Sequence, residues 1–435
     1  MNTTEKIYDV IVAGGGMTGV AAAVAAARLG AKTLLIEQSA ILGGIGTAGG
    51  LTSLIARTPW FGGIGLELVR RLEKSGGAEP YTTKHDMPYD LEHMKLALDE
   101  LVCESGAELL LYSKITDISL SENKIAALEL CGQNGKFTVR GRYFIDCTGD
   151  AMLAYMSGEP YETGDETGNT QAPTLASQFI GVDWNAYRKF LKPYGGDNVP
   201  MIREILPKAV EAGDIRVADF HHPGAFRIND RITLVNAGHV YGADCLSSAG
   251  LTEATLEGRR LAHEYLKFYK KYIPGFENAY MTFTAATLGI RETRRLTGQY
   301  TVTFEDKSFY RKFDDVILRY EGGGESDLHA SSPSKEAYMN YYKLFTQVKP
   351  LNDDWADLPY RCILPQKTKN LLVAGRCLSA DRKVQGRLRV MGYCLLMGQA
   401  AGNAAAICAE SGIDCDKINI KSLQNALTEQ GVPTV

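Results

Sequence analysis

The sequence predicts an α/β fold in which both ends of the chain build one parallel sheet and a mixed α+β region is inserted between them. Three observations predict this. Residues 8–37 have the pattern of a strand, a glycine turn, a helix and a strand, residues 108–146 have the pattern of three consecutive strands, and residues 370–375 form a further apolar strand near the C-terminus. Strands that alternate with helices are typical of a parallel sheet.

The composition is that of an ordinary globular protein, with 45% hydrophobic and 23% charged residues. A formal net charge of −4 with scattered lysines and arginines predicts no nucleic-acid partner and no anionic lipid surface. The nine cysteines never fall as CxxC, and none of the seven histidines has a metal-ligand spacing. We therefore expect a cytoplasmic protein without a leader segment, disulfides, zinc, iron–sulfur clusters or another metal.

The first strand, residues 8–13, leads into a GxGxxG motif made by Gly14, Gly16 and Gly19. Gly14 allows a tight turn, Gly16 lets the backbone approach a pyrophosphate, and Gly19 lets helix and strand pack closely. The helix that follows begins around Met17 and Thr18, where free N–H groups favour phosphate. Gly30 is expected to end this helix.

The second strand ends at Glu37, which Gln38 follows. A carboxylate at this position accepts hydrogen bonds from both ribose hydroxyls of a dinucleotide and repels a 2′-phosphate. Strand, motif, helix, strand and terminal acid at these spacings predict a dinucleotide site. The alternative is a merely glycine-rich turn.

The next segments help to identify the dinucleotide. Residues 42–54, with Gly43, Gly44 and Thr47, are too rich in glycine for a helix or strand and are expected to lie against a ligand, unless they form a flexible surface loop. A helix capped by Asp90 and ended by Gly106 comes next, followed by strands over 108–121, 124–130 and 136–146. An NAD-binding unit would place another strand–helix–strand here, so a three-stranded antiparallel meander indicates something different.

The last of these strands runs into Cys147-Thr148-Gly149-Asp150. Here the chain resembles the FAD-binding flavoproteins of the glutathione-reductase type, whose meander leads back to a strand ending in Thr-Gly. The resemblance implies FAD as the cofactor. It also implies backbone contacts near the phosphates and adenosine at Thr148, Gly149 and Asp150, and a main-chain contact to adenine around Ile115. An ordinary strand-ending turn is the alternative.

The C-terminal part contains a charge-free run, residues 390–409, which as a helix would be about as long as a bilayer's hydrocarbon core is thick. Gln399 and Asn403 lie four residues apart within it, and two amides would be costly in lipid. We therefore expect no membrane span. The run is predicted to be a buried helix whose first turn opens near residues 397–402.

This ending is similar to that of a large, mostly bacterial family of FAD-dependent oxidoreductases. The matching positions are Gly375, Arg376, Ser379, Arg389, Val390, Gly398, Gln399, Ala400, Ala401 and Gly402, together with the GIRETRRLTGQY element at 289–300. The resemblance implies that the final helix directs its N-terminus at the flavin, with cofactor contacts at Gly375, Arg376, Gly398, Gln399, Ala400 and Ala401. The chain departs from the family between 381 and 393, which leaves substrate specificity open.

These assignments divide the chain into three parts. Residues 1–155 and 361–435 are expected to form the two parts of a Rossmann-like FAD domain, and 156–360 an inserted α+β substrate domain that returns to the FAD domain around 225–300. Within it, a long helix is predicted from an N-cap at Thr252 to Pro274-Gly275. A second GxGxxG with strand and helix context is missing from the sequence, so electrons are expected from the substrate or from an external donor or acceptor.

Candidate catalytic residues follow the cofactor motifs or end strands of the inserted region: Arg57, His239, Tyr241, Arg387, Arg389 and Tyr393. Arginines can clamp a carboxylate, which suits a small anionic substrate. The alternative is that Arg291 and Arg389 are structural and pair with acids such as Glu292. His239 is either a proton carrier or a domain-interface histidine, and His221 and His222 are expected at the surface.

The sequence therefore indicates an FAD-dependent dehydrogenase or reductase that acts on a small polar, possibly anionic metabolite by hydride transfer to or from flavin N5. Two alternatives stay open at this point. One is an electron-carrying flavoprotein subunit that works with a partner, and the other is a tRNA-modifying flavoprotein. The oligomeric state is open as well.

Overall fold

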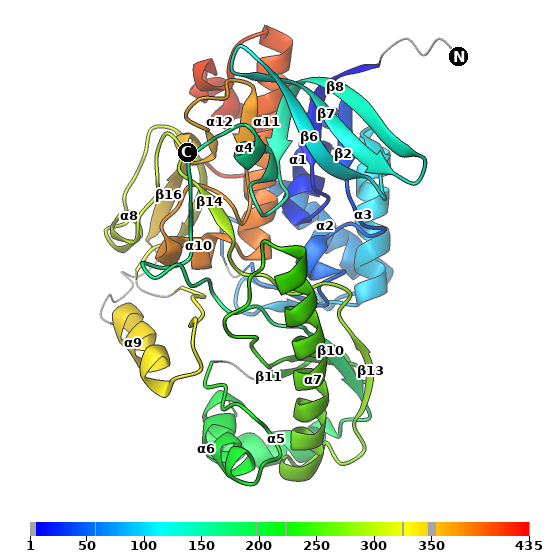
Figure 1. Ribbon diagram of the computed structural model, residues 1–435, viewed down its shortest axis with the longest axis vertical. Coiled ribbons are helices and arrows are strands. Elements are labelled where there is room, and N and C mark those ends of the chain that lie inside the picture. Colours follow the sequence, from blue (N-terminus) through cyan, green and yellow to red (C-terminus); the bar gives the residue numbers. More distant parts are fainter. Residues whose placement is uncertain are drawn as a thin grey trace.

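The computed structural model describes residues 6–56, 58–196, 198–221, 224–323, 326–346 and 354–434. The molecule is elongated and has two lobes (Figure 1). The first lobe contains both ends of the chain, coloured blue to cyan and orange to red, and the second lobe contains the green middle of the chain. The sheet of the first lobe thus joins distant parts of the sequence, as the strand pattern predicted.

The first lobe is built on a seven-stranded sheet. Four parallel neighbours run in the order β5 (Glu108–Leu110), β2 (Thr33–Ile36), β1 (Ile7–Ala13) and β8 (Gly135–Asp146), and β17 (Leu371–Val373) pairs with the end of β8. The first half of β8 continues antiparallel through β7 (Lys124–Gly132) to β6 (Lys114–Ser121). The parallel sheet and its antiparallel meander are therefore confirmed.

One predicted strand is divided in the structure. Residues 108–121 form β5, which lies beside β2 in the parallel sheet, and β6, which belongs to the meander. Between them Tyr112 has a positive φ of 54°, a conformation that ends a strand. The separation lets one stretch of chain serve two parts of the sheet.

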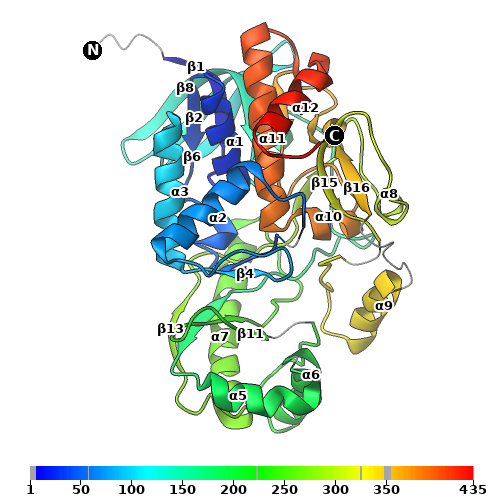
Figure 2. The ribbon, with the colours of Figure 1, turned by 180° about the vertical axis from the view of Figure 1, so that it is seen from behind.

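Two helices from opposite ends of the sequence lie side by side on the sheet, α1 (Met17–Arg28) and α11 (Met391–Ser411) (Figure 2). A Cβ added at Gly398 would lie 2.1 Å from the carbonyl oxygen of Thr18, and one at Gly402 would lie 2.2 Å from that of Ala22. Only glycine permits this approach, and the two helices are buried against each other over most of their length.

The predicted start of the buried C-terminal helix is wrong: α11 begins at Met391, before the expected opening near 397–402. The glycines near Gly398 serve the packing on α1 and do not open the helix. Among the described residues no single helix is long and apolar enough to cross a membrane, while α10 (Arg382–Leu388) and α11, bent by 89°, together pass that test by length and composition only.

The helices α2 (Gly63–Ser75) and α3 (Leu91–Ser105) pack beside α1, and α12 (Ile420–Glu429) packs on α11. Asp90 caps α3 as predicted, since its carboxylate accepts hydrogen bonds from the N–H groups of Glu92 and His93. Gly106 ends the helix in a left-handed conformation with φ 86°. A short pair, β3 (Ser53–Leu54) and β4 (Met87–Pro88), lies at the edge of this layer that faces the second lobe.

The second lobe is built on a four-stranded antiparallel sheet in the order β11 (Gly224–Arg227), β12 (Thr233–Asn236), β10 (Ser177–Ile180) and β13 (Tyr280–Thr284). The long helix α7 (Ser248–Tyr272) packs on it, and α5 (Trp184–Leu191) and α6 (Asn198–Glu211) close the far end (Figure 1). The aromatic core of this lobe includes Phe179, Phe268 and Phe276.

Helix α7 starts earlier than predicted. Its N-cap is Ser247, whose hydroxyl accepts a hydrogen bond from the N–H of Gly250. Thr252 lies inside the first turns, where its hydroxyl donates to the carbonyl oxygen of Ser248. A serine and a threonine five residues apart both suit an N-cap, and the local sequence does not distinguish them.

The chain returns from the second lobe through two small antiparallel pairs, β14 (Arg294–Leu296) with β9 (Tyr161–Thr163) and β15 (Val316–Glu321) with β16 (Trp355–Pro359). Ile317 and Tyr320 of β15 belong to the core of the first lobe. The remaining helices are α4 (Met152–Met156), α8 (Phe304–Ser308) and α9 (Lys335–Thr346). The division of the chain at 155 and 360 stays a prediction.

Candidate active site

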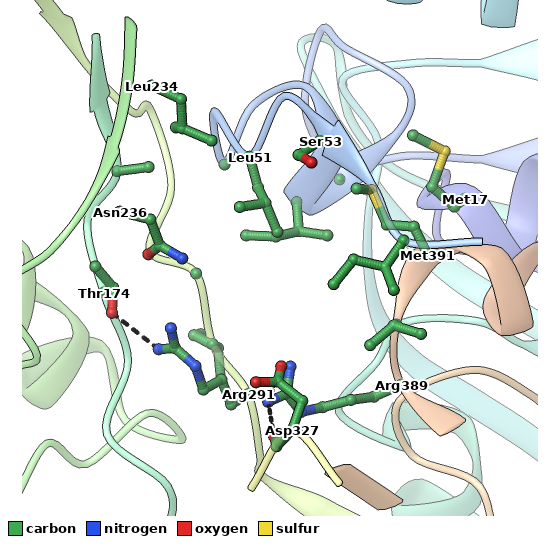
Figure 3. A pocket seen from close by; sticks show the side chains of 18 of the residues that line it. Met17, Leu51, Ser53, Thr174, Leu234, Asn236, Arg291, Asp327, Arg389 and Met391 are labelled. Atoms are coloured by element: carbon green, nitrogen blue, oxygen red, sulfur yellow. Dashed lines mark hydrogen bonds and ion pairs between the residues drawn. The ribbon is translucent and has the colours of Figure 1, made fainter. Parts of the chain in front are cut away.

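A cavity of about 1190 Å³ runs from the first lobe into the second. Its first end is formed by the glycine turn after β1, the loop over 43–55 and residues 147–149, and its other end by β11 and β12. Figure 3 shows Met17 and Met391 on one side of it, and Arg291, Asp327 and Arg389 gathered on another. The cavity therefore joins the predicted dinucleotide site to charged groups supplied by the middle of the chain.

The glycine motif has the geometry that the sequence predicts. Gly14 has φ 95°, and a Cβ there would lie 2.7 Å from the carbonyl oxygen of Cys147. A Cβ at Gly19 would lie 1.8 Å from the carbonyl oxygen of Gly14, so helix and turn need glycine to pack. At Gly16, by contrast, no described atom lies within 4 Å of the Cβ position, and the residue lines the cavity. This open space is where a pyrophosphate fits against the backbone.

Glu37 lines the same end of the cavity and is held in place by the backbone. One carboxylate oxygen accepts a hydrogen bond from the N–H of Gly15 at 2.7 Å, and the other accepts one from the N–H of Ser39 at 2.7 Å. Each oxygen keeps a second lone pair. The carboxylate is thus preorganised to accept hydrogen bonds from ribose hydroxyls.

A carboxylate that the sequence reasoning missed shapes the turn after β8. Asp146 is fully buried and accepts hydrogen bonds from the N–H and hydroxyl of Thr148 at 3.1 and 2.7 Å. It also accepts from the N–H groups of Leu153 and Ala154, at the start of α4. Burial raises the pKa of Asp146. An acid at the end of an apolar strand was the available signal.

The predicted cofactor residues fall into two groups. Those that line the cavity are Gly14, Gly16, Met17, Thr18, Glu37, Gln38, Gly43, Gly44, Thr148, Gly149 and Arg376. Those outside the described lining are Gly19, Thr47, Ile115, Asp150, Gly375, Gly398, Gln399, Ala400 and Ala401. Asp150, in the second group, supports a residue of the first, since its carboxylate lies 2.7 Å from the guanidinium of Arg376.

The helix that was expected to face the flavin reaches the cavity with other residues than those predicted. Val390, Met391 and Cys394, at the first turn of α11, line the cavity. Gln399 lies two turns deeper and is directed away from it, because its side-chain oxygen accepts a hydrogen bond from the N–H of Ile64 at 2.8 Å. Its amide group donates to Gln430 at 2.8 Å.

Side chains from three loops meet at the wall of the cavity between the lobes. His239 Nδ1 lies 2.7 Å from Asp219 Oδ2, His239 Nε2 lies 2.7 Å from His329 Nδ1, and His329 Nε2 lies 3.0 Å from Asp327 Oδ1. The ring of His221 lies against that of His329, with centroids 4.0 Å apart and an interplanar angle of 34°. His221 is buried and lines the cavity, so its expected place at the surface is wrong. His222 lies outside the described residues.

The environment of these groups perturbs their pKa values. Burial alone would raise the pKa of Asp219, but the charge and hydrogen bonds of His239 outweigh it and lower that pKa to about 2. Burial, followed by the positive charge of Arg291, holds the pKa of His329 well below its usual value. For Asp327 the effect of burial is outweighed by Arg389 and His329, which hold its pKa well below the usual range.

The arginines differ in their partners. Arg291 is buried and donates to the carbonyl oxygen of Ala172 at 2.7 Å and to the hydroxyl of Thr174 at 2.9 Å. Burial and then the like charge of Arg389 lower the pKa of Arg291 to about 10. Arg389 forms an ion pair with Asp327 at 3.0 Å. This agrees with the alternative that Arg389 is structural and pairs with a nearby acid.

The expectation that Glu292 pairs with Arg291 or Arg389 is wrong. Its carboxylate accepts hydrogen bonds from Arg295 and, at 2.9 Å, from Arg382. Glu292 and Arg291 are neighbours in sequence, but their side chains have different partners.

The other predicted catalytic residues lie as follows. Arg387 lines the cavity and pairs with Glu321 at 2.7 Å. Tyr393 donates to the same carboxylate and is outside the described cavity lining. Tyr241 lies behind the histidines, where its hydroxyl donates to Asp219 Oδ1 at 2.9 Å. Arg57 lies outside the described residues.

His221, Asp327 and His329 place one ligand-type atom each within 4.8 Å of one another, a grouping that the sequence spacing could not reveal. Both ring nitrogens of His329 are already hydrogen-bonded, to His239 and to Asp327. We therefore interpret the cluster as a hydrogen-bonded network.

The chain combines a parallel sheet, a glycine turn and an antiparallel meander with a cavity that continues from the turn into the second lobe. These features define an enzyme of the nucleotide-cofactor class. The comparisons with known proteins identify the family. The model of the FAD dependent oxidoreductase family matches residues 9–427, and the chain belongs to this family. It is an enzyme, its cofactor is FAD, and the open cradle at Gly16 and Glu37 fits the pyrophosphate and ribose of that cofactor.

Solved structures show the same fold. The p-nitrophenol 4-monooxygenase of Pseudomonas putida DLL-E4 is 10% identical, with a TM-score of 0.50, over 98% of this chain and 85% of that one. A flavin-dependent brominase is 10% identical, with a TM-score of 0.50, over 98% of this chain and 84% of that one. At this identity the likeness concerns the fold alone.

Proposed function

We propose that this enzyme oxidises or reduces a small polar, anionic metabolite that binds between the first turn of α11 and the histidine cluster. Bound FAD would supply the hydride chemistry, at N5 of the flavin. The observation that carries the proposal is the single cavity that runs from the glycine turn past Met391 to Arg291, Arg389 and His329. A substrate in this cavity would lie beside the cofactor and within reach of charged side chains.

The charges of the cavity wall favour an anion. Among the described residues no carboxylate forms an ion pair with Arg291, which donates its hydrogen bonds to neutral oxygens of Ala172 and Thr174. Its positive charge is therefore available to a ligand. A substrate carboxylate about 4 Å from this guanidinium would gain about 4 kcal/mol at the effective dielectric constant of a protein surface. Asn236 and Thr174 add uncharged hydrogen-bonding groups nearby (Figure 3).

Arg291 and Arg389 are held in place by neighbouring groups and are positioned to bind the substrate. Arg291 is fixed by two hydrogen bonds, so it can hold a carboxylate with little further loss of side-chain entropy. Asp327 fixes Arg389 beside it. Buried polar walls of this kind favour a bound small molecule over a flavin exposed to a partner protein.

The visible spectrum of the FAD-loaded protein tests the proposal. We would record it before and after anaerobic addition of hydroxy acids, amino acids, unsaturated acids and uncharged sugars. Bleaching of the flavin bands by one group of anionic compounds is the expected result for an oxidation. If the enzyme works as a reductase, dithionite-reduced protein is expected to be reoxidised by an unsaturated acid.

A pair of arginine variants sharpens this test. Arg291→Gln is expected to raise the concentration needed for half-maximal reaction about 10²-fold or more, because a lost charge-assisted hydrogen bond costs about 3 kcal/mol. Arg260→Gln, on the surface of α7 with its side chain 65% exposed, serves as the control and should behave as the parent enzyme. Reaction with uncharged sugars alone, or equal behaviour of the two variants, would refute the proposed anionic substrate.

A further inference from the structure

We propose that Asp219, His239 and His329 form a proton relay, in which the two histidines together hold one proton more than two neutral imidazoles and exchange it with the substrate. The role toward the substrate rests on the proposed function. The number of hydrogens on the two histidines is independent of the proposed function.

The relay is a line of hydrogen bonds with a carboxylate at each end. Its three links join Asp219 to His239 at 2.7 Å, His239 to His329 at 2.7 Å, and His329 to Asp327 at 3.0 Å. Each ring uses both of its nitrogens. Every link is short enough to be a true hydrogen bond, which requires one hydrogen in each.

Counting hydrogens gives the charge of the pair. Two neutral imidazoles carry one N–H each, and they would leave one of the three links without a hydrogen. Without it, either two ring lone pairs would face each other at 2.7 Å or a lone pair would face a carboxylate oxygen at about 3 Å. Three links between two carboxylates and two imidazoles therefore require one additional proton.

The surroundings place this proton on His239. Asp219 is 2% exposed, and its carboxylate accepts hydrogen bonds from the ring and N–H of His239, from the N–H of His221 and from the hydroxyl of Tyr241. Such a saturated, buried carboxylate stays ionised and stabilises a neighbouring imidazolium. His329 is kept neutral by burial and by Arg291, so it accepts from His239 and donates to Asp327.

One end of the relay faces the cavity and the other end lies behind it. His329 and Asp327 line the cavity, whereas His239 and Asp219 lie behind them. The charged or titratable groups that face it are His221 and Arg291 beside His329, Arg389 beside Asp327, and Tyr241 and Tyr265 around Asp219. The two guanidiniums balance the two carboxylates, and the additional proton leaves one positive charge, which suits a monoanionic ligand.

The exchange is balanced as follows. When the substrate gains a hydride at carbon, the Nε2 proton of His329 passes through Asp327, its hydrogen-bond partner at the cavity wall, to the adjacent heteroatom of the substrate. The Nε2 proton of His239 then moves to Nδ1 of His329. The pair is then left with two protons. In the oxidising direction these transfers run in reverse, so the pair starts with two protons and ends with three.

Nitrogen-15 NMR of the histidine rings tests the relay without any substrate. FAD-loaded protein labelled at histidine would be measured between about pH 6 and pH 8, the range in which free histidine titrates. His239→Gln and His329→Gln assign the signals. Three N–H groups on the pair, two of them on His239, are the expected result, and two N–H groups in total would overturn the proposal.

Two variants separate charge from hydrogen bonding. Asp219→Asn removes the charge that holds the imidazolium and is expected to reduce the pair to two N–H groups. Tyr241→Phe removes one hydrogen bond from Asp219 without changing its charge, and the pair should keep three. An unchanged count in Asp219→Asn would show that Asp219 does not hold the proton and would overturn its place in the relay.

Kinetics then tests the exchange with the substrate. With a compound that reoxidises the dithionite-reduced enzyme, Asp219→Asn is expected to slow reoxidation about 10²-fold or more and to alter its pH profile, because the variant lacks the additional proton. The flavin spectrum after reoxidation shows whether FAD is retained. An unaltered pH profile would refute the exchange. If no compound reacts with the parent enzyme, the proposed function fails, and the NMR count still decides whether the proton is there.

Discussion

Replacing Glu292 by glutamine tests how the site is held together. Glu292 is fully buried, and its carboxylate accepts hydrogen bonds from Arg295, from Arg382 at 2.9 Å and from the N–H of Gln171 at 3.0 Å. Gln171 in turn accepts a hydrogen bond from the N–H of His329 at 3.0 Å. One carboxylate therefore connects the element at 289–300, the helix α10 and the loop that carries His329.

The magnitude follows from the charges that are left behind. Glutamine presents one acceptor in place of a charged carboxylate. Buried Arg295 and partly buried Arg382 therefore lose their closest counter-charge. Breaking a buried pair in this way costs about 3–5 kcal/mol. Unfolding entropy is about 2.1 cal/mol/K per residue, so for 435 residues the cost corresponds to a fall in Tm of roughly 3–6 °C.

Thermal unfolding followed by circular dichroism, with FAD in excess, measures this fall. Glu162→Gln is the matched control, since Glu162 contacts the same Arg295 at 3.3 Å with a side chain that is 64% exposed. An exposed pair contributes about 0–1 kcal/mol, so the control should lie within about 1 °C of the parent. A Glu292→Gln protein within about 1 °C of the parent, or equal shifts for the two variants, would refute the reasoning.

Two further predictions concern the cofactor and pH. Gly16→Ala should leave the Tm of the FAD-free protein unchanged, because φ at Gly16 is −65° and the Cβ position is open. The added methyl group should weaken FAD binding at least about tenfold, which fluorescence titration measures. An unchanged affinity for FAD would contradict the pyrophosphate site at Gly16. Below about pH 6.5 unfolded histidine takes up a proton that buried His329 resists, so its contribution makes stability fall by about 1.4 kcal/mol per pH unit as pH decreases. Urea unfolding across pH should show this slope in the parent and a shallower one in His329→Gln. The stabilisation from Asp219 is present above about pH 3.8 and is lost as pH falls toward 2.

The sequence by itself determined the cofactor end of the molecule. Strand β1, the turn at Gly14–Gly19, helix α1 and Glu37 occupy about thirty consecutive residues, and their spacing specifies both their structure and their ligand. The meander and β17 were predictable for the same reason, because a few adjacent apolar residues are enough to indicate a strand. Asp90 could be identified as a cap because capping is also a local interaction.

Only the tertiary structure decided the substrate end. Asp219, His239 and His329 come from three loops, more than a hundred residues from first to last, and no periodicity links them. The start of α11 depended on its packing against α1, where Gly398 serves close approach to Thr18. Periodic patterns report which face of an element is buried, whereas the meeting of loop side chains depends on how two lobes pack, which no short stretch of sequence contains.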